Sequence, residues 1–277
     1  MKKTTFFTRL FSLLIVSILL FTVGCSNEND TIETEISKST LDKLKAAHFD
    51  VTKAKSTFFQ GEYGIAVEDM FFTLEQIDEM AADGINTKQY RTNNLVSVRG
   101  SSREITVSVD PELGQLGSDA LDGMIAMYNT ENLRLTFRRV AFGGKGKRKA
   151  NIEVTEFYEL ESGGFITLGR AAGFPTRKGD PAKGFGINSR WFELLNPSLA
   201  EVTGTMAHEV GHCIGFRHTD YMTRESCGSN VNEGSGRIGA IHIAGTPTNS
   251  DASSLMQSCG PADSFNNNDR IALDVLY

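Results

Sequence analysis

The sequence is poor in several residue types that mark specialised classes of protein. Its 277 residues include only 4 cysteines, 6 prolines and one tryptophan. Four cysteines are too few for a fold built on disulfides, and the overall composition is that of a globular protein, which excludes collagen-like, coiled-coil and wholly disordered chains. Positive charge is also in deficit, with 28 Lys and Arg against 34 Asp and Glu. Because nucleic-acid binding requires clustered positive charge, we expect no nucleic-acid partner.

No apolar run is long enough to span a bilayer, but a shorter one lies near the start. It extends from Leu10 to Val23, about 14 residues, follows Lys and Arg residues, and ends at Gly24-Cys25. A stable spanning helix needs about 20 residues, so we interpret residues 1–24 as a lipoprotein signal peptide. Cys25 stands where a bacterial lipoprotein carries its lipid. We therefore expect an exported protein, anchored through Cys25 to the bacterial outer membrane or cell surface; cleavage nearby without lipidation is the alternative.

The remaining chain divides into three parts by composition and pattern. Residues 25–40 are polar and acidic, which is typical of a flexible tether. Residues 41–100 contain a hairpin pattern at 58–72 and form either a pro-like region or an accessory one. Residues 101–277 combine alternating strand patterns with amphipathic helices, which indicates an α+β domain.

Two of the strand patterns in this domain are joined by a glycine- and lysine-rich segment. Residues 133–140 and 152–158 alternate between apolar and polar side chains, and Gly143-Gly-Lys-Gly-Lys-Arg-Lys149 lies between them. The basic run could bind a ligand, but a solvated hairpin loop accounts for it more simply. We therefore expect these two strands to be neighbours.

One segment concentrates the histidines. Of the chain's 5, three occur in His208-Glu209-Val-Gly-His212-Cys-Ile-Gly215-Phe-Arg-His218. A capping box at Ser198-Leu-Ala-Glu201 predicts a helix from there to Gly215. Residues four apart share one face of a helix, so His208 and His212 can bind the same metal ion. The left-handed turn that glycine permits then brings His218 back to that ion.

This spacing predicts a catalytic zinc site. Three neutral imidazoles leave one of the four tetrahedral positions open for water, whereas a closed structural site needs a fourth protein ligand. Glu209 lies about 100° around the helix from His208, beside the ligands without being one. We predict one Zn²⁺ ion bound by His208, His212 and His218, with Glu209 as the general base that takes a proton from the zinc-activated water.

The extended motif resembles that of the metzincin zinc metallopeptidases. More narrowly, residues 208–221 (HEVGHCIGFRHTDY) are similar to the bacterial dual-action HEIGH metallo-peptidases, with Val210 where that name has isoleucine. The likeness extends from about residue 41 to the C-terminus. It implies a metzincin-like α+β zincin fold, with a twisted mixed sheet, an active-site helix and a smaller C-terminal subdomain.

The resemblance also implies two further roles. Metzincins have a methionine beneath the metal, in a tight turn after the third histidine, and here that residue is Met256. Some add a tyrosine two residues later, where this chain has Ser258; that role is unfilled, or taken by Tyr221. Phe59-Gln-Gly-Glu62 is similar to the segment through which some metzincin pro-segments offer a carboxylate to zinc, which would make Glu62 a blocking residue.

Three cysteines remain if Cys25 is lipidated. Cys227 and Cys259 flank the segment leading into and out of the methionine turn, and an exported protein could join them in a disulfide. Cys213 lies on the predicted catalytic helix, and we expect it to be a buried free thiol.

We interpret the protein as a secreted zinc endopeptidase, active as a monomer on a peptide or protein substrate. The peptide would bind in extended form along an edge strand of the cleft within residues 165–174. Two alternatives stay open: a zinc hydrolase acting on non-peptide amides or esters, and a non-catalytic surface lipoprotein whose fold the metal stabilises.

Overall fold

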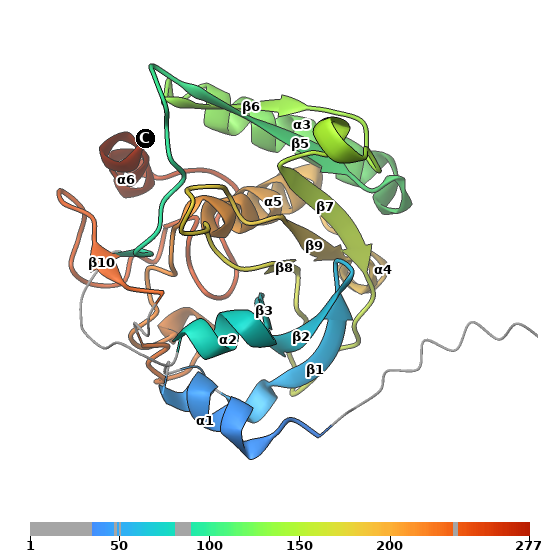
Figure 1. The fold of residues 1–277 in the computed structure, drawn as a ribbon, viewed down its shortest axis with the longest axis vertical. Helices are drawn as coiled ribbons and strands as arrows, with labels where there is room; N and C mark the ends of the chain where they lie inside the picture. The colour runs from blue at the N-terminus through green and yellow to red at the C-terminus, as the bar shows by residue number, and fades with distance from the viewer. Residues whose placement is uncertain (1–34, 47–48, 50, 81–89, 235–237) are drawn as a thin grey trace, which may run out of the picture. The chain divides into compact units, whose positions relative to one another are not determined.

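An eight-stranded mixed sheet organises the part of the chain that the computed structural model describes, which is residues 35–46, 49, 51–80, 90–234 and 238–277 (Figure 1). In spatial order its strands are β1 (Lys55–Phe59), β2 (Glu62–Val67), β3 (Met70–Thr73), β8 (Gly169–Ala171), β9 (Gly184–Asn188), β7 (Ile152–Phe157), β5 (Arg103–Val109) and β6 (Leu135–Arg139). A second small sheet pairs β4 (Tyr90–Arg91) with β10 (Ile241–His242). The signal peptide, Cys25 and most of the tether fall outside the described residues.

Strand direction divides the large sheet into two halves. Strands β9, β7, β5 and β6 are parallel to one another, whereas β8 is antiparallel to β9. Strand β3 joins β8 in parallel and continues through β2 to β1 as an antiparallel meander. The hairpin pattern at residues 58–72 is therefore confirmed, and this meander extends the same sheet.

The expected hairpin between residues 133–140 and 152–158 is wrong. Both segments are strands, β6 and β7, but β5 lies between them and pairs in parallel with each. The glycine- and lysine-rich segment is thus a crossover that contains the short 3₁₀ helix Gly146–Arg148. Alternation of apolar and polar residues reports which face of a strand is buried, and it carries no information about the neighbouring strand.

Six α-helices are present in the described residues. They are α1 (Lys38–Ala46), α2 (Leu74–Met80), α3 (Gly114–Asn129), α4 (Ser189–Leu195), α5 (Leu199–Ile214) and α6 (Asn267–Leu276). Short 3₁₀ turns cover Val51–Lys53, Pro111–Leu113, Gly146–Arg148 and Glu225–Cys227. None of the described helices is both long and apolar enough to cross a membrane.

Helix α5 begins and ends where its sequence signals lie. The hydroxyl of Ser198 accepts a hydrogen bond from the Glu201 backbone N–H at 3.2 Å, and the Glu201 carboxylate accepts one from the Ser198 N–H at 2.7 Å. This capping box satisfies N–H groups that the first turn leaves without partners. At the other end Gly215 has φ of 116°, the left-handed conformation that glycine adopts without steric cost.

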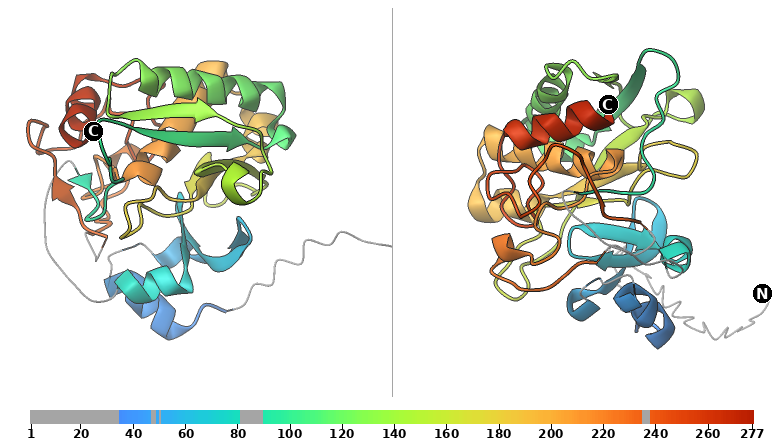
Figure 2. Two further views of the ribbon diagram at one scale, coloured as in Figure 1. Left: turned by 45° about the horizontal axis from the view of Figure 1, so that its top comes forward. Right: turned by 90° about the vertical axis from the view of Figure 1, so that its left-hand side faces the viewer.

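The two long helices place the site against the sheet. Helix α3 packs on β5 and β6, α5 packs on β8 and β9, and the two helices pack on each other (Figure 2). Leu121, Met124 and Tyr128 of α3 are fully buried in this layer, at the spacing of one helix face. The chain after α5 forms a smaller C-terminal part with little regular structure before α6. These features confirm the predicted α+β fold with a mixed sheet and a central helix.

Candidate metal centre

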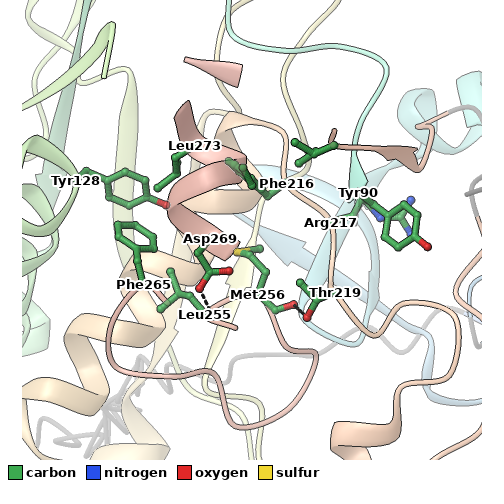
Figure 3. Close-up of a pocket in the computed structure, with 12 residues that line it drawn as sticks. Tyr90, Tyr128, Phe216, Arg217, Thr219, Leu255, Met256, Phe265, Asp269 and Leu273 are labelled. Carbon is green, nitrogen blue, oxygen red and sulfur yellow. Dashed lines mark hydrogen bonds between the residues drawn. The ribbon is translucent and has the colours of Figure 1, made fainter. Parts of the chain in front are cut away.

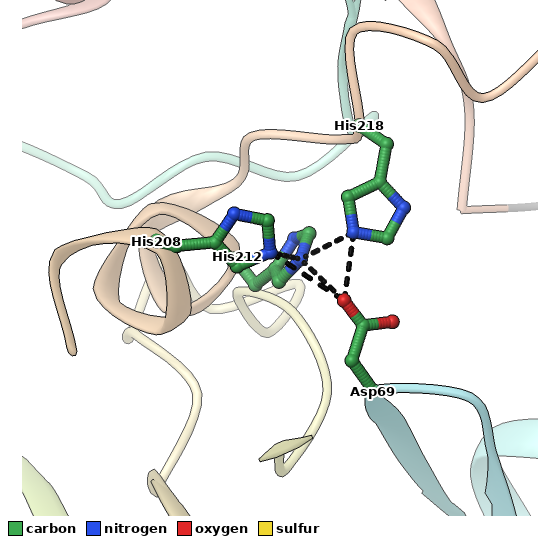
Figure 4. A group of neighbouring side chains, drawn as sticks. All are labelled: Asp69, His208, His212 and His218. Carbon is green, nitrogen blue, oxygen red and sulfur yellow. Dashed lines mark hydrogen bonds and ion pairs between the residues drawn. The ribbon is translucent and has the colours of Figure 1, made fainter. Parts of the chain in front are cut away.

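The three motif histidines converge on one point (Figure 4). His208 and His212 extend from α5, and His218 follows from the segment after Gly215. The Nε2 atom of His212 lies 3.1 Å from Nε2 of His208 and 3.1 Å from Nε2 of His218. All three side chains are buried.

Each imidazole is oriented by a hydrogen bond from its other nitrogen. Nδ1 of His208 lies 2.8 Å from the Leu255 carbonyl oxygen, and Nδ1 of His212 lies 2.9 Å from that of Phe216. Carbonyl oxygens only accept, so both Nδ1 atoms carry the proton. The Nε2 lone pairs therefore face the common point, and burial helps to keep His212 neutral by lowering its pKa to about 4.

This donor set fits a zinc ion. Zinc–nitrogen bonds of about 2.0–2.1 Å place tetrahedral ligand atoms roughly 3.3 Å apart, close to the spacing of the three ring nitrogens. Neutral imidazoles whose lone pairs meet at such distances repel one another unless a cation lies between them. The residues present are those that would hold Zn²⁺.

A buried carboxylate that sequence reasoning missed orients the third histidine. Glu233 accepts a hydrogen bond from Nδ1 of His218, with Oε1 at 2.7 Å. Arg224 donates to the same carboxylate at 2.6 Å, and Arg217 lies 3.5 Å from its other oxygen. Burial opposes ionisation, but His218 and the two arginines lower the pKa of Glu233 to about 2. Glu233 lies 15 residues from His218 in an irregular segment, so no spacing rule points to it.

Glu209 lies beside the histidines and is not among the metal-ligand atoms. Its side chain is 2% exposed, and its Oε2 has no hydrogen-bond partner in the described residues. The backbone of β8 passes close by, because a Cβ built on Gly169 would stand 2.4 Å from Glu209 Oε1. Burial, reinforced by a nearby carboxylate, raises the pKa of Glu209 well above its usual range. A raised pKa of this kind is typical of carboxyl groups that take part in proton transfer.

A second carboxylate reaches the centre from far away in the chain. Asp69, on the turn between β2 and β3, points its Oδ2 at the three ring nitrogens (Figure 4). That atom lies 2.7 Å from Nε2 of His218, 3.4 Å from His208 and 3.6 Å from His212.

The expectation that Glu62 supplies a carboxylate to the metal is wrong. Glu62 starts β2 and pairs at the surface with Lys183. Asp69 lies beyond the other end of that strand, and at about 3.3 Å per residue β2 separates its two ends by roughly 17 Å. The Phe59-Gln-Gly-Glu62 segment instead forms the β1–β2 turn, where Gln60 and Gly61 both have positive φ. Glu62 therefore lies away from the histidines.

Met256 lies directly under helix α5. A Cβ on Gly211 would approach its sulfur to 2.5 Å, so glycine is required for this close contact. Its carbonyl accepts a hydrogen bond from the Thr219 N–H at 2.8 Å, immediately after His218. Figure 3 shows the region behind it, where Asp269 accepts a hydrogen bond from the Leu255 N–H. The cavity there has a volume of only about 10 Å³, so the support beneath the histidines is tightly packed.

The remaining predicted residues lie around this centre. Cys227 and Cys259 are joined by a disulfide, and Cys213 is a buried free cysteine. Tyr221 packs its ring on Tyr90, with the ring centroids 4.0 Å apart.

The site opens into a cleft with a volume of about 830 Å³. One wall is the segment leading into β8, residues 164–170, and the floor includes His208 and Glu209 of α5. A cleft of this size can accommodate several residues of an extended peptide. Three convergent histidines, an adjacent buried glutamate and a cleft that opens onto them define a zinc metallopeptidase.

Comparisons with known proteins agree with this class. The chain belongs to the family of dual-action HEIGH metallo-peptidases, whose sequence profile matches residues 65–277. Myroilysin, a solved structure, shares 14% identity, with 64% of this chain and 95% of that chain covered and a TM-score of 0.38. High choriolytic enzyme 1, a hatching-enzyme zinc-protease from the medaka fish Oryzias latipes, shares 14% identity over 66% of this chain and 94% of that chain, with a TM-score of 0.40. No curated protein matches the sequence.

Proposed function

We propose that the protein is a secreted zinc endopeptidase that cleaves peptide bonds with Glu209 as general base. One observation carries the proposal: three buried Nε2 atoms converge within a cleft, and the Glu209 carboxyl stands beside them with one oxygen free. A structural metal site would have no use for an unpartnered buried glutamate, because such a group costs stability.

The residues divide the chemistry between them. Zinc, when bound, supplies a Lewis acid that acidifies water and polarises the peptide carbonyl. Glu209 accepts the proton of the attacking water and delivers it to the leaving amine. The Glu209 side chain extends from α5 and lies against Gly169, which keeps the carboxyl in one position and away from bulk water. Glu233 and the carbonyls of Leu255 and Phe216 keep the imidazoles in the tautomer that can bind metal.

Substrate binding follows from the geometry of the cleft. Strand β8 is paired with β9 on one side and with β3, at Met70, on the other, whereas the segment before it, residues 164–168, lines the cleft. An extended peptide can lie along this segment through backbone hydrogen bonds, which position it without demanding a particular sequence. We expect the scissile carbonyl to lie over the histidines, next to Glu209.

The experiment compares the zinc-loaded chain with Glu209→Gln on an unbiased peptide library. Glutamine keeps the size of the side chain and cannot accept the proton, so we expect cleavage to fall by at least about 100-fold while zinc content is unchanged. Equal cleavage by both proteins would refute the role of Glu209. Cleavage of amide or ester substrates other than peptides would replace the endopeptidase by a different zinc hydrolase. Turnover of no substrate by any variant would favour the binding lipoprotein.

We also propose that Cys25 carries a lipid and that the chain acts outside the cytoplasm. The support is the signal-like sequence before Cys25, together with the Cys227–Cys259 disulfide, since disulfides persist in oxidising compartments. Labelled palmitate supplied to expressing cells should appear in the wild type and be lost in Cys25→Ala. Cys213→Ala is the matched control and should retain the label.

A further inference from the structure

A basic loop connects β6 to β7 on the surface of the molecule. Its sequence, Gly143-Gly-Lys-Gly-Lys-Arg-Lys149, contains four cationic residues and no acidic one. We propose that this basic loop binds the phosphate groups of an anionic lipid membrane and so fixes the face that the protein turns toward that membrane. The inference goes beyond the proposed peptidase activity and does not depend on it, because none of the loop residues lines the cleft.

The charge of the basic loop is largely uncompensated. All four of its cationic side chains are exposed. Lys149 pairs with Glu153 at 2.9 Å, whereas Lys145, Lys147 and Arg148 form no ion pair with any residue that the structure describes. Three neighbouring cations without counter-charges repel one another, and an anion that approaches them relieves the repulsion. The basic loop therefore favours a ligand that carries several negative charges.

The backbone gives the basic loop a defined shape. Gly146 has φ of 58°, and a Cβ on Gly144 would stand 2.1 Å from the Arg148 carbonyl oxygen, so the chain folds back on itself here. The Arg148 N–H donates to the Lys145 carbonyl oxygen at 3.2 Å, which closes the 3₁₀ turn. The cations are thus presented together on one turn. Binding through a turn that is already formed costs less conformational entropy than binding through a flexible segment.

An exposed aromatic residue favours a membrane over other anionic partners. Phe142 immediately precedes the basic loop, and its side chain is 38% exposed. Aromatic rings are favourable at the boundary between lipid headgroups and acyl chains, where nearby Lys and Arg can reach the phosphates. A nucleic acid also offers phosphates, but it has no apolar layer for Phe142, and the net charge of −6 on the chain disfavours a long polyanion.

Binding at the basic loop is compatible with an accessible cleft. The loop precedes β7, and Glu159, two residues after the end of that strand, lines the cleft. At about 3.3 Å per residue, β7 separates its two ends by roughly 17 Å. The loop and the cleft therefore lie toward opposite ends of this strand, and a membrane and a substrate can be bound together. A lipid on Cys25 would tether the chain, and the basic loop would set its orientation.

The test measures trypsin cleavage of the full chain in the presence of lipid vesicles. The vesicles consist of phosphatidylcholine alone, or of phosphatidylcholine and phosphatidylglycerol in equal parts. Trypsin cuts after Lys and Arg, so the basic loop is itself a cleavage site, and mass spectrometry of the fragments gives the rate at each position. Arg177, which is exposed and lies outside both the loop and the cleft, reports the access of trypsin to the rest of the molecule.

We expect phosphatidylglycerol to slow cleavage of the wild type after Arg148 by at least about 10-fold, because several cations near an anionic surface contribute together to binding. Cleavage after Arg177 should not change. High salt should remove the protection, because it screens the charges.

Variants then assign the protection to particular side chains. Lys145→Gln/Lys147→Gln should lose most of it, although Arg148 remains available to trypsin. Phe142→Ser should weaken it. The matched control is Arg99→Gln/Lys178→Gln, which removes two exposed cations elsewhere on the surface and should keep the protection.

Three results would overturn the proposal. Equal cleavage of the wild-type loop with both kinds of vesicle would refute binding to anionic lipid. Equal protection after Arg148 and Arg177 would show that vesicles shield the molecule without contacting the basic loop in particular. A DNA duplex that protects the loop as well as the vesicles do, at the same phosphate concentration, would assign the loop to nucleic acid. None of these results depends on whether the protein is a peptidase.

Discussion

Glu233 and His218 form a buried pair in which Oε1 lies 2.7 Å from Nδ1, and the pair sets the orientation of the third histidine. His218 comes after α5 and lacks the helical support of His208 and His212. Its ring is held instead by Glu233, which two arginines keep ionised. His218 is therefore positioned by a network of charged side chains, whereas backbone carbonyl groups position His208 and His212.

Removing the charge of Glu233 should weaken metal binding. In Glu233→Gln the side chain keeps its size, but its interaction with His218 weakens and Arg217 and Arg224 lose their buried counter-charge. We expect zinc affinity, measured by competition with a chelator, to fall by about 10–100-fold. Glu104→Gln removes an exposed partner of Arg138 and should leave the affinity unchanged. Equal affinities for both variants would show that His218 is oriented without Glu233.

A methyl group at Gly169 should displace the general base. The Cβ of Gly169→Ala would stand 2.4 Å from Glu209 Oε1 and 2.8 Å from its Cδ, so the carboxyl must move. Misplacement of a catalytic group by about 1 Å can cost around 100-fold, and we expect a loss of kcat/KM of that order with zinc content retained. Gly123→Ala, a substitution on α3, is the control and should retain activity.

The disulfide should contribute substantially to stability. Cys227 and Cys259 close a loop with a sequence separation of 32 residues. Loop-closure entropy for this length corresponds to about 3–4 kcal/mol of unfolding free energy, which Cys227→Ser/Cys259→Ser should lose. Denaturant unfolding with and without a reductant provides the check. The unfolding free energy of the double variant should not change when the reductant is added. That of the wild type should fall to the value of the variant. A wild type whose unfolding free energy is unaffected by the reductant would contradict the prediction.

The ion pair between Arg170 and Glu159 should make stability depend on pH in the acid range. The Arg170 side chain is 5% exposed, and its Nη2 lies 2.9 Å from Glu159 Oε2. Burial opposes ionisation of Glu159, but Arg170 outweighs it, so the pKa of Glu159 is lower in the folded than in the unfolded protein. The pair therefore stabilises the fold above the unfolded pKa of about 4.3, and this contribution disappears as pH falls through the folded value.

Glu159→Gln should accordingly destabilise the protein by roughly 2–4 kcal/mol at pH 7, because Arg170 stays buried without its partner. The difference in unfolding free energy between wild type and variant should become smaller as the pH is lowered below about 4, where wild-type Glu159 also becomes neutral. Urea unfolding at pH 7, 5 and 3 measures this difference. Glu104→Gln, at the exposed pair with Arg138, should differ from wild type by less than about 1 kcal/mol at each pH. If this difference in unfolding free energy did not change with pH, titration of Glu159 would be excluded as its cause.

Local signals in the sequence predicted helix α5, which contains His208, Glu209 and His212. The capping box at Ser198 and the glycine at position 215 bound α5 as expected, because both act through hydrogen bonds and dihedral angles within a few residues. The four-residue spacing of His208 and His212 places their side chains on one face for the same reason. Such features need no knowledge of the rest of the fold.

Partners that are distant in the chain were not predictable in this way. Strands β6 and β7 have clear alternation, yet their separation by β5 depends on how the chain crosses over the sheet. Asp69 meets His218 across 149 residues, and nothing in the Val67-Glu68-Asp69-Met70 stretch distinguishes its carboxylate from others. The resemblance pointed to Glu62 because it compared short motifs, whereas the turn that faces the histidines lies at the opposite end of β2.

The sequence by itself determined the convergence of the three imidazoles and the place of the adjacent glutamate, because one helix and one glycine turn bring those groups together through local geometry. Only the tertiary structure decided what surrounds them. Folding of the β1–β3 meander onto β8 brings Asp69 to the three imidazoles, and the segment after α5 brings Glu233 to the third histidine. Both contacts depend on the packing of segments distant in sequence, which no periodicity within a segment records.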